Sequence, residues 1–242
     1  MSFLSNANTW LSNLSDSAVR DIATRINEDG IFWLPDFLAT DDLQKMREFV
    51  AEAIARGGHQ SVSLRSDELD GSGLDELAGS KPFRDLFSRL YLVGTGQPAP
   101  VVKFHQILRC LTGESVAKHS LMFHYDSYIL TALIPVEIPA TGKRGDFLII
   151  PNTRQIRSNY VFNLADKVVL DNALVQRVLR ARASNGKVKR VSMQPGALYL
   201  FWGYRSIHTN EPVDEGAVRA TALYHYADPH ADSFVKRQLG RR

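Results

Sequence analysis

The chain has 242 residues, of which 44% are hydrophobic and 23% are charged, and this balance favours a folded globule over a disordered chain. Its net charge of +3 is small, and no run of about 18 apolar residues is present, which excludes a membrane-spanning helix. The single cysteine, Cys110, cannot form an internal disulfide, and the N-terminus lacks the apolar run of a secretory signal. We therefore expect a cytoplasmic protein with one domain over residues 1–242.

The positive charge is concentrated in one segment. Residues 152–190 contain nine lysines or arginines and two aspartates, a net charge of +7, which leaves −4 for the rest of the +3 chain. A basic patch on an otherwise acidic body favours an anionic ligand over general nucleic-acid binding.

The first hundred residues are expected to be mostly helical. Apolar residues recur at helical spacing in three segments, each with a start or stop signal: 16–28 before Gly30, a helix capped by Thr40 and ended by Gly57, and a helix opened by Ser80. Between the second and third helices, residues 59–79 are rich in Ser, Asp and Gly. We expect a surface loop there, with an active-site lid as the alternative.

From residue 101 the pattern changes to short runs of β-branched and aromatic residues, typical of antiparallel strands. The predicted strands are 101–111, 120–137, 145–151, 188–193, 197–208 and 217–227. Helices followed by many short strands predict a mainly β fold with flanking helices. The expected architecture is a double-stranded β-helix, or jelly roll, with residues 1–100 as a helical buttress and 101–228 as the β core.

The insertion at 152–190 interrupts this core and should contain its own helix. Asp171 is its expected cap, and the expected apolar stripe consists of Leu174, Val175, Val178 and Leu179. Arg177 and Arg180 are left on the other faces. We interpret the insertion as a solvated surface, and the alternative is a clamp in which these two arginines bind the substrate.

The motif Phe123-His124-Tyr125-Asp126 lies inside the predicted strand 120–137. Alternation along a strand places His124 and Asp126 on the same face. A second histidine from another strand would complete a 2-His-1-carboxylate triad, which binds Fe(II) and leaves positions open for chemistry. His208, at the end of the predicted strand 197–208, is the expected third ligand. The remaining histidines considered are expected to pack in the core, to lie on the surface or to neighbour the metal ligands without binding the metal: His105, His119, His225 and His230.

Arg219 follows His208 on the next predicted strand and shares a face with Thr221. A buried arginine is costly unless it meets an anion, and its planar fork suits a carboxylate. Trp202 and Tyr204 share alternation parity with His208, so they are expected either to line the substrate pocket or to belong to the core.

The order of these motifs resembles the phytanoyl-CoA dioxygenase-like branch of the 2-oxoglutarate/Fe(II)-dependent dioxygenases. The similar elements run from about residue 30 to residue 227 and comprise the motif at 123–126, the runs Gly-Asp-Phe-Leu-Ile-Ile-Pro at 145–151 and Gln-Pro-Gly-Ala at 194–197, His208, and Arg-Ala-Thr at 219–221. The resemblance implies that His124, Asp126 and His208 bind Fe(II). It also implies that Arg219 and Thr221 hold the distal carboxylate of 2-oxoglutarate and that Gln106 contacts this co-substrate. The family's usual Pro-Gly-Ser-His is replaced by Pro-Asn-Thr-Arg at 151–154, which leaves the substrate side different.

The resemblance implies an enzyme that uses Fe(II), 2-oxoglutarate and O2 to oxidise an unactivated C–H bond of a small metabolite or natural-product intermediate. Succinate and CO2 would be the co-products, and Asp126 favours hydroxylation because halogenating relatives lack this carboxylate. The expected partners are a small substrate, anionic on the evidence of the basic segment, with no nucleic acid, no membrane, and a monomeric or homodimeric state.

Two alternatives stay open: a jelly-roll metal enzyme with another chemistry, and a non-catalytic binding module with a basic groove. Neither would be expected to need Arg219. The sequence contains no GxSxG, HExxH or Walker A motif and no paired cysteines, so hydrolase, zinc protease, NTPase and zinc-finger functions have no support.

Overall fold

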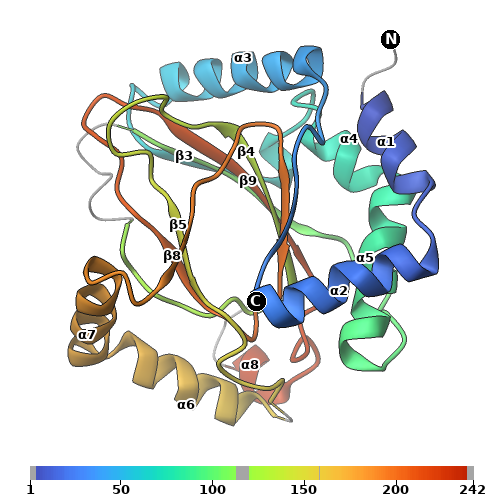
Figure 1. The fold of residues 1–242 in the computed structure, drawn as a ribbon, viewed down its shortest axis with the longest axis vertical. Helices are drawn as coiled ribbons and strands as arrows, with labels where there is room; N and C mark the ends of the chain where they lie inside the picture. The colour runs from blue at the N-terminus through green and yellow to red at the C-terminus, as the bar shows by residue number, and fades with distance from the viewer. Residues whose placement is uncertain (1–3, 113–119, 158, 239–242) are drawn as a thin grey trace.

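Two antiparallel sheets form the centre of the protein in the computed structural model, which describes residues 4–112, 120–157 and 159–238 (Figure 1). The larger sheet has the strand order β1-β7-β4-β9-β3-β2, and the smaller sheet has the order β6-β5-β8. The strands are β1 (Phe32–Leu34), β2 (Val62–Arg65), β3 (His105–Leu111), β4 (Leu130–Glu137), β5 (Phe147–Ile150), β6 (Lys189–Val191), β7 (Leu198–Phe201), β8 (Ile207–Asn210) and β9 (Arg219–Tyr226).

The two sheets face each other across an apolar layer. Leu133 of β4 and Phe201 of β7 pack against Phe147 and Ile149 of β5. The rings of Phe147 and Phe201 are 5.2 Å apart. Packed sheets with antiparallel strands are the arrangement of a jelly roll, which confirms the fold class predicted from the sequence.

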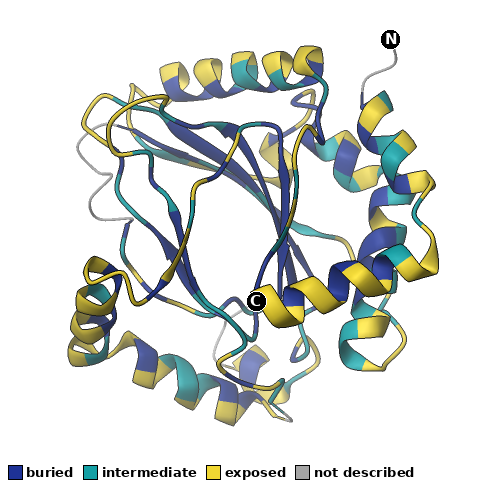
Figure 2. Ribbon diagram, in the orientation of Figure 1, coloured by how far each residue is buried: buried dark blue, intermediate teal, exposed yellow. Residues whose placement is uncertain are grey.

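Helices cover the outer face of the larger sheet. They are α1 (Ser5–Ser12), α2 (Asp16–Asp29), α3 (Thr40–Arg56), α4 (Leu74–Gly79) and α5 (Lys81–Thr95). Even-numbered residues of β3, β4, β7 and β9 belong to the same buried cluster as the apolar faces of these helices. Figure 2 shows that the helices are buried toward the sheet and exposed on their outer sides. The odd-numbered residues of these strands are therefore left to face the smaller sheet.

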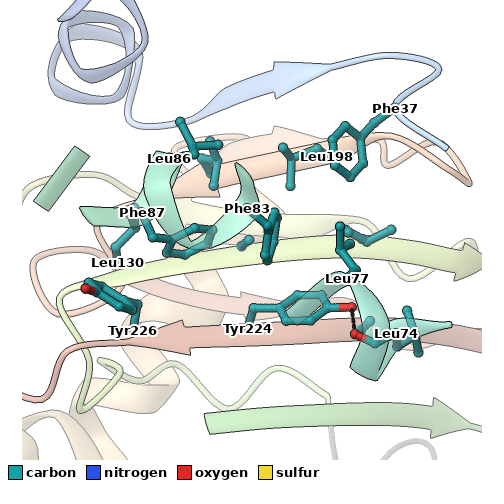
Figure 3. Packing of buried hydrophobic residues seen from close by; sticks show 14 of the residues in the cluster. Phe37, Leu74, Leu77, Phe83, Leu86, Phe87, Leu130, Leu198, Tyr224 and Tyr226 are labelled. Atoms are coloured by element: carbon teal, nitrogen blue, oxygen red, sulfur yellow. Dashed lines mark hydrogen bonds between the residues drawn. The ribbon is translucent and has the colours of Figure 1, made fainter. Parts of the chain in front are cut away.

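Aromatic packing fixes β9 against the helices. Phe83 of α5 meets Tyr224 edge-on at a ring distance of 5.2 Å, and Phe87 meets Tyr226 at 5.7 Å (Figure 3). The Tyr224 hydroxyl donates a hydrogen bond of 3.0 Å to the carbonyl oxygen of Leu74, which satisfies a polar atom in an apolar layer. One face of β9 is thus held rigidly, and its other face is available for a site.

The N-terminal helices agree with the sequence predictions at most of their ends. Gly30 ends α2 with a φ of 82°, a left-handed conformation that glycine adopts without strain, and Ser80 caps α5. The predicted cap of α3 is wrong, because Ala39 occupies that position and Thr40 is the first helical residue. The predicted loop at 59–79 is also wrong in part, since it contains β2, a short 3-10 helix (Ser66–Glu68) and α4.

Two predicted strands are shorter than expected. The run 120–137 becomes a strand only at Leu130, and the run 197–208 is divided into β7 and β8, which belong to different sheets. A turn separates them, in which the amide of Ser206 donates to the carbonyl oxygen of Trp202 at 3.0 Å. His208 therefore lies in the smaller sheet and not at the end of a long strand in the larger one.

The insertion forms two helices, α6 (Tyr160–Asp171) and α7 (Ala173–Ser184), and a short helix, α8 (Phe234–Gln238), follows β9. Asn172 caps α7 through a hydrogen bond of 2.9 Å from the amide of Leu174, so the prediction of Asp171 as the cap is wrong. The predicted stripe is correct at Leu179, which is buried, and at Val175, which packs against the same apolar cluster, but it is wrong at its other two positions. Leu174 and Val178 are exposed, whereas the buried positions are Gln176, Leu179 and Ala183.

The two insertion helices cover the outer face of the smaller sheet. Leu170 and Leu179 pack there with Leu148 of β5 and with Phe123. In the part of the chain that the structure describes, no helix has the length and apolar character needed to cross a membrane.

Candidate metal centre

His124 and His208 lie side by side and line one pocket, with His208 on β8 of the smaller sheet. Each backbone amide donates to the other residue's carbonyl oxygen at 3.0 Å, so the two residues form a β-bridge although 123–126 is not a regular strand. Their ring centres are 4.4 Å apart. Main-chain pairing of a short segment with β8 therefore places two imidazoles next to each other.

Both imidazoles are oriented by the backbone. Nδ1 of His124 is 2.9 Å from the carbonyl oxygen of Met122, and Nδ1 of His208 is 3.0 Å from the carbonyl oxygen of Ser206. A carbonyl only accepts, so Nδ1 carries a proton in each ring, and the Nε2 atom is the one that faces the other candidate ligands. Outer hydrogen bonds of this kind are usual for metal-binding histidines.

Asp126 completes the group. Its Oδ1 atom is 3.4 Å from Nε2 of His208 and 3.9 Å from Nε2 of His124. The three candidate ligand atoms all lie within 4.8 Å of one another. Two imidazoles and one carboxylate that converge on one point form a donor set that suits Fe(II).

Two neighbours confine the Asp126 carboxylate. The Thr131 hydroxyl donates to its Oδ2 atom at 2.5 Å. Gly203 lies against the same atom, and a Cβ at Gly203 would be 2.2 Å from it. Only glycine leaves room for the carboxylate here, and the hydroxyl then fixes which oxygen faces the histidines.

The electrostatics favour the forms of these side chains that bind a metal. Desolvation and, after it, the charge of His208 lower the pKa of His124 to about 4. Burial raises the pKa of Asp126, but the adjacent His208 and His225 outweigh that effect and hold it well below its usual range. At neutral pH, His124 is neutral and Asp126 is ionised, as metal ligation requires.

His225 neighbours the candidate ligand Asp126, which is one of the roles that the sequence left open for it. Its Nδ1 atom lies 3.0 Å from the Thr131 hydroxyl and 3.6 Å from Oδ2 of Asp126. Its ring stacks on Tyr128 at 5.1 Å, and Tyr128 stacks on His105 at 5.3 Å. His225 and Thr221 are four residues apart on the last predicted strand, so their side chains are expected on the same face. This shared face was the signal that could have placed His225 near the site.

Arg219 and Thr221 line the same pocket as the two histidines of the triad. Arg219 is 4% exposed and Thr221 is 2% exposed. The Nε atom of Arg219 and the hydroxyl oxygen of Thr221 are both buried without a hydrogen-bond partner. Buried polar atoms are rarely left unpaired, so this pair is suited to an anionic ligand that supplies the missing acceptors.

Gly145 makes the position of Arg219 possible. A Cβ at Gly145 would lie 2.6 Å from Cδ of Arg219, and the φ of Gly145 is 73°. The glycine that precedes β5 thus lets the arginine side chain pass close to the backbone. This gives a physical role to the first residue of the motif at 145–151.

The pocket as a whole combines polar side chains from both sheets with an apolar wall. Its lining residues are Arg109, His124, Thr131, Leu133, Phe147, Phe201, His208, Thr209, Asn210, Arg219, Thr221, Leu223 and His225. Arg109 is a second arginine in this pocket, and sequence analysis did not single it out.

Gln106 is not brought to this pocket, and the expectation that it contacts a co-substrate there is corrected. As an even-numbered residue of β3 it lies buried on the helix-covered face near Tyr224. Burial raises the pKa of the Tyr224 phenol well above its usual value, and Gln106 opposes this shift. Gln106 therefore faces away from the candidate metal centre.

Trp202 and Tyr204 also lie outside the pocket, in the core beneath the helices. Trp202 donates to Oδ1 of Asn27 at 2.9 Å, and the Tyr204 hydroxyl pairs with Nε2 of His230 at 2.9 Å. The turn between β7 and β8 breaks the alternation that linked them to His208. Of the two readings of these residues, the structure supports the core.

Arg154, which stands where the similar family usually has histidine, makes structural contacts in this chain. Its guanidinium lies 3.8 Å from the ring centre of Tyr125 and 4.1 Å from that of Tyr204, and its Nε donates to the Tyr204 carbonyl oxygen at 2.7 Å. Because Tyr125 lies between two candidate ligands in the sequence, Arg154 helps to hold the ligand segment from its outer side.

Arg177 and Arg180 lie on α7, which covers the smaller sheet from outside. Arg177 is exposed and Arg180 is half-buried, and neither lines the pocket. Several other basic residues of the insertion are neutralised locally: Arg154 and Arg157 both pair with Asp166, and Arg190 pairs with Glu211. His119 lies outside the described residues.

Comparison with known proteins gives structural relatives only. No protein-family model matches the chain, and no curated protein matches it. Among solved structures, a prolyl hydroxylase from Trichoplax adhaerens, in complex with a hypoxia inducible factor peptide fragment, is similar over 93% of this chain and 96% of its own, with 14% identity and a TM-score of 0.60.

Two further solved structures are similar at comparable levels. An oxidoreductase of the 2OG-Fe(II) oxygenase family from Burkholderia pseudomallei covers 87% of this chain and 90% of its own, with 14% identity and a TM-score of 0.55. The non-heme alpha ketoglutarate dependent epimerase SnoN from nogalamycin biosynthesis covers 88% and 84%, with 16% identity and a TM-score of 0.53. The chain therefore has the fold of 2-oxoglutarate/Fe(II) oxygenases, and these matches do not specify the phytanoyl-CoA dioxygenase-like branch.

Proposed function

We propose that this protein is an Fe(II)/2-oxoglutarate-dependent oxygenase that hydroxylates an unactivated C–H bond of a small molecule, with succinate and CO2 as co-products. The observation that carries the proposal is the content of one pocket. It is lined by the two oriented histidines that Asp126 joins in one cluster, and by a buried arginine, Arg219, whose Nε has no partner. A metal site alone would not need that arginine.

Each residue has a defined task in this proposal. His124, Asp126 and His208 would hold Fe(II) through two Nε2 atoms and one carboxylate oxygen. Arg219 and Thr221 would hold the distal carboxylate of 2-oxoglutarate through their unpartnered polar atoms. Thr131 and His225 keep the Asp126 carboxylate in place. Iron with bound co-substrate supplies the oxidation of the C–H bond by O2, and the chain supplies positions and charges.

The fold supports this chemistry without fixing the reaction outcome. A prolyl hydroxylase and an epimerase share the fold, and the epimerase is also known with Fe3+ and alpha ketoglutarate bound. Fold alone does not determine function, so hydroxylation is proposed because Asp126 occupies the third ligand position. The substrate is proposed to be a small anionic metabolite or natural-product intermediate, consistent with the basic insertion.

The proposal is tested by reconstitution. Anaerobic titration of the protein with Fe(II) and 2-oxoglutarate should give the visible charge-transfer absorption of the chelated metal. After admission of O2, candidate substrates should stimulate succinate formation. His124→Ala and His208→Ala should abolish both signals, whereas His59→Asn, which removes an exposed imidazole, should change neither. Binding of 2-oxoglutarate without succinate formation by any substrate would favour a binding module, and retention of Fe(II) affinity in both alanine variants would refute the metal site.

A further inference from the structure

Arg109 lies on β3 and faces the same pocket as the triad. In the register of the larger sheet it is directly opposite Thr221 of β9. Arg219 is two residues from Thr221 on the same strand and therefore on the same face. Thr221 is thus flanked by two arginines, one across the strand pair and one along its own strand, and all three residues line the pocket.

The two arginines have no anion of their own in the described structure. Arg109 makes no hydrogen bond or ion pair there, and Arg219 donates only to Sδ of Met193, at 3.6 Å. The charge of Asp146 attracts Arg219, but no ion pair joins them. A second cation placed beside a buried one is unfavourable in a low-dielectric pocket unless an anion lies between them.

Burial and charge show that the two guanidinium groups interact. The pKa of Arg219 is lowered to about 10, first by burial and then by the charge of Arg109. The pKa of Arg109 is lowered by burial, and the charge of Asp126 opposes this effect. Arg109 is therefore electrostatically coupled both to Arg219 and to the candidate metal ligand.

We propose that Arg109 is a second anchor for the distal carboxylate of 2-oxoglutarate, which would lie between Arg109 and Arg219 with Thr221 as a further donor. This inference rests on the proposed function. A carboxylate has two oxygens with about four acceptor positions, enough for two guanidinium groups and a hydroxyl. The unpartnered Nε of Arg219 and hydroxyl of Thr221 are donors that such a carboxylate would satisfy.

The arrangement has a consequence for co-substrate selection. A 2-oxo acid that lacks the distal carboxylate would leave two cations and a hydroxyl unpaired in the pocket. A site built around charged hydrogen-bonding groups rejects an analogue that lacks the matching group far more strongly than an apolar pocket does. The two arginines would therefore make the protein strictly dependent on a dicarboxylate.

The test compares two ligands that differ only at the distal end. The protein is loaded with Mn(II) in place of Fe(II), and the binding of 2-oxoglutarate and of 2-oxovalerate, which has a methyl group instead of the distal carboxylate, is measured by calorimetry. Arg109→Leu should weaken 2-oxoglutarate binding by at least about 30-fold, which corresponds to about 2 kcal/mol at 1.4 kcal/mol per tenfold. It should leave 2-oxovalerate and Mn(II) binding unchanged. Arg109→Lys should restore part of the loss, and Arg25→Leu, which removes an exposed arginine of α2, should have no effect.

Other outcomes would overturn the inference in distinguishable ways. Equal weakening of both ligands would place Arg109 at the metal end of the co-substrate, and no change in either would assign it to the primary substrate or to structure. If Arg109→Leu also lost Mn(II), the Arg109→Lys protein would decide, since the inference requires weaker 2-oxoglutarate binding there with Mn(II) and 2-oxovalerate unchanged. Wild-type protein that bound Mn(II) but no 2-oxoglutarate would overturn the proposed function together with this inference.

Discussion

The side chain of Gln176 holds both backbone polar groups of Phe123. Its Oε1 atom accepts from the Phe123 amide at 3.0 Å, and its Nε2 atom donates to the Phe123 carbonyl oxygen at 2.7 Å. The same nitrogen also donates to the carbonyl oxygen of Leu170 at 2.8 Å. Gln176 belongs to α7 of the insertion, and Phe123 directly precedes the candidate ligand His124. The insertion therefore holds the ligand segment in place from outside the smaller sheet.

We expect Gln176→Leu to weaken metal binding without touching a ligand. The buried Phe123 amide and carbonyl would lose their partners, which costs about 1–3 kcal/mol for each unsatisfied group. The bridge between His124 and β8 would then loosen, and Mn(II) affinity should fall on the order of 10-fold, in the range found for outer partners of metal ligands. Calorimetric Mn(II) titration and thermal unfolding measure the two effects. Gln155→Leu, at an exposed position of the preceding loop, is the matched control. Wild-type Mn(II) affinity in the Gln176 variant would show that α7 has no part in the metal site.

Gly203→Ala should damage the site by steric displacement. The added Cβ would lie 2.2 Å from Oδ2 of Asp126 and 2.4 Å from the Thr131 hydroxyl, so the carboxylate must move. Overpacking of this kind typically destabilises a protein by about 1–3 kcal/mol. Mn(II) affinity should fall by more than about 10-fold, because a displaced carboxylate no longer shares a point with two fixed imidazoles. Gly79→Ala, where a Cβ meets nothing within 4 Å, controls for the substitution itself. An unchanged metal affinity would mean that Asp126 is not confined by Gly203.

Sequence reasoning identified the residues of the triad from spacing and chemistry, but the route by which the chain brings them together was different. Alternation in a strand was the reason for pairing His124 with Asp126, whereas the structure uses a single β-bridge and a hydrogen bond of 3.1 Å from the Asp126 amide to the Gly203 carbonyl oxygen. The three candidate ligands still come together because the bridge and this hydrogen bond place His124 and Asp126 beside His208 without a regular strand. The strand lengths were overestimated because apolar runs do not reveal where a turn changes sheets.

The errors on the surrounding residues have a common cause. Side chains alternate between two faces only within one continuous strand. The prediction for Trp202 and Tyr204 assumed that this alternation continues to His208, but a turn between β7 and β8 interrupts it. Within β3 it works well: Gln106 faces the helices and Arg109 faces the pocket, two opposite faces of one strand. Which face is inside depends on the helices that cover the sheet, and that information is not contained in the strand itself.

Arg219→Leu should weaken co-substrate binding without lowering the stability of the protein. The arginine is buried without a carboxylate partner, and replacing a buried unpaired charge by an apolar side chain is often neutral or stabilising. The melting temperature without ligand should therefore be unchanged or higher. The apparent KM for 2-oxoglutarate should rise on the order of 30-fold or more, since a charge-assisted contact to a buried carboxylate contributes about 2–5 kcal/mol. The KM for the primary substrate should change far less. A variant that turns over with the wild-type 2-oxoglutarate dependence would make Arg219 a structural residue.

The basic surface of α7 includes Arg177, which is exposed, and Arg180, which is half-buried. Neither side chain lines the pocket, so an effect on an anionic substrate must act through the electric field and not through contact. The double variant Arg177→Glu with Arg180→Glu should lower kcat/KM at low ionic strength and leave kcat and 2-oxoglutarate affinity unchanged.

That difference should shrink as salt is added, because the Debye length falls from about 30 Å at 0.01 M to about 8 Å at 0.15 M. The measurement is kcat/KM across this salt range for a substrate identified by succinate formation. Arg20→Glu with Arg25→Glu makes the same charge change on α2, which lies across the molecule from α7 in Figure 1, and should have a smaller effect. Identical salt dependence in wild type and variant would assign the arginines of α7 to a solvated surface. A change in oligomer size would instead place them at an interface between subunits.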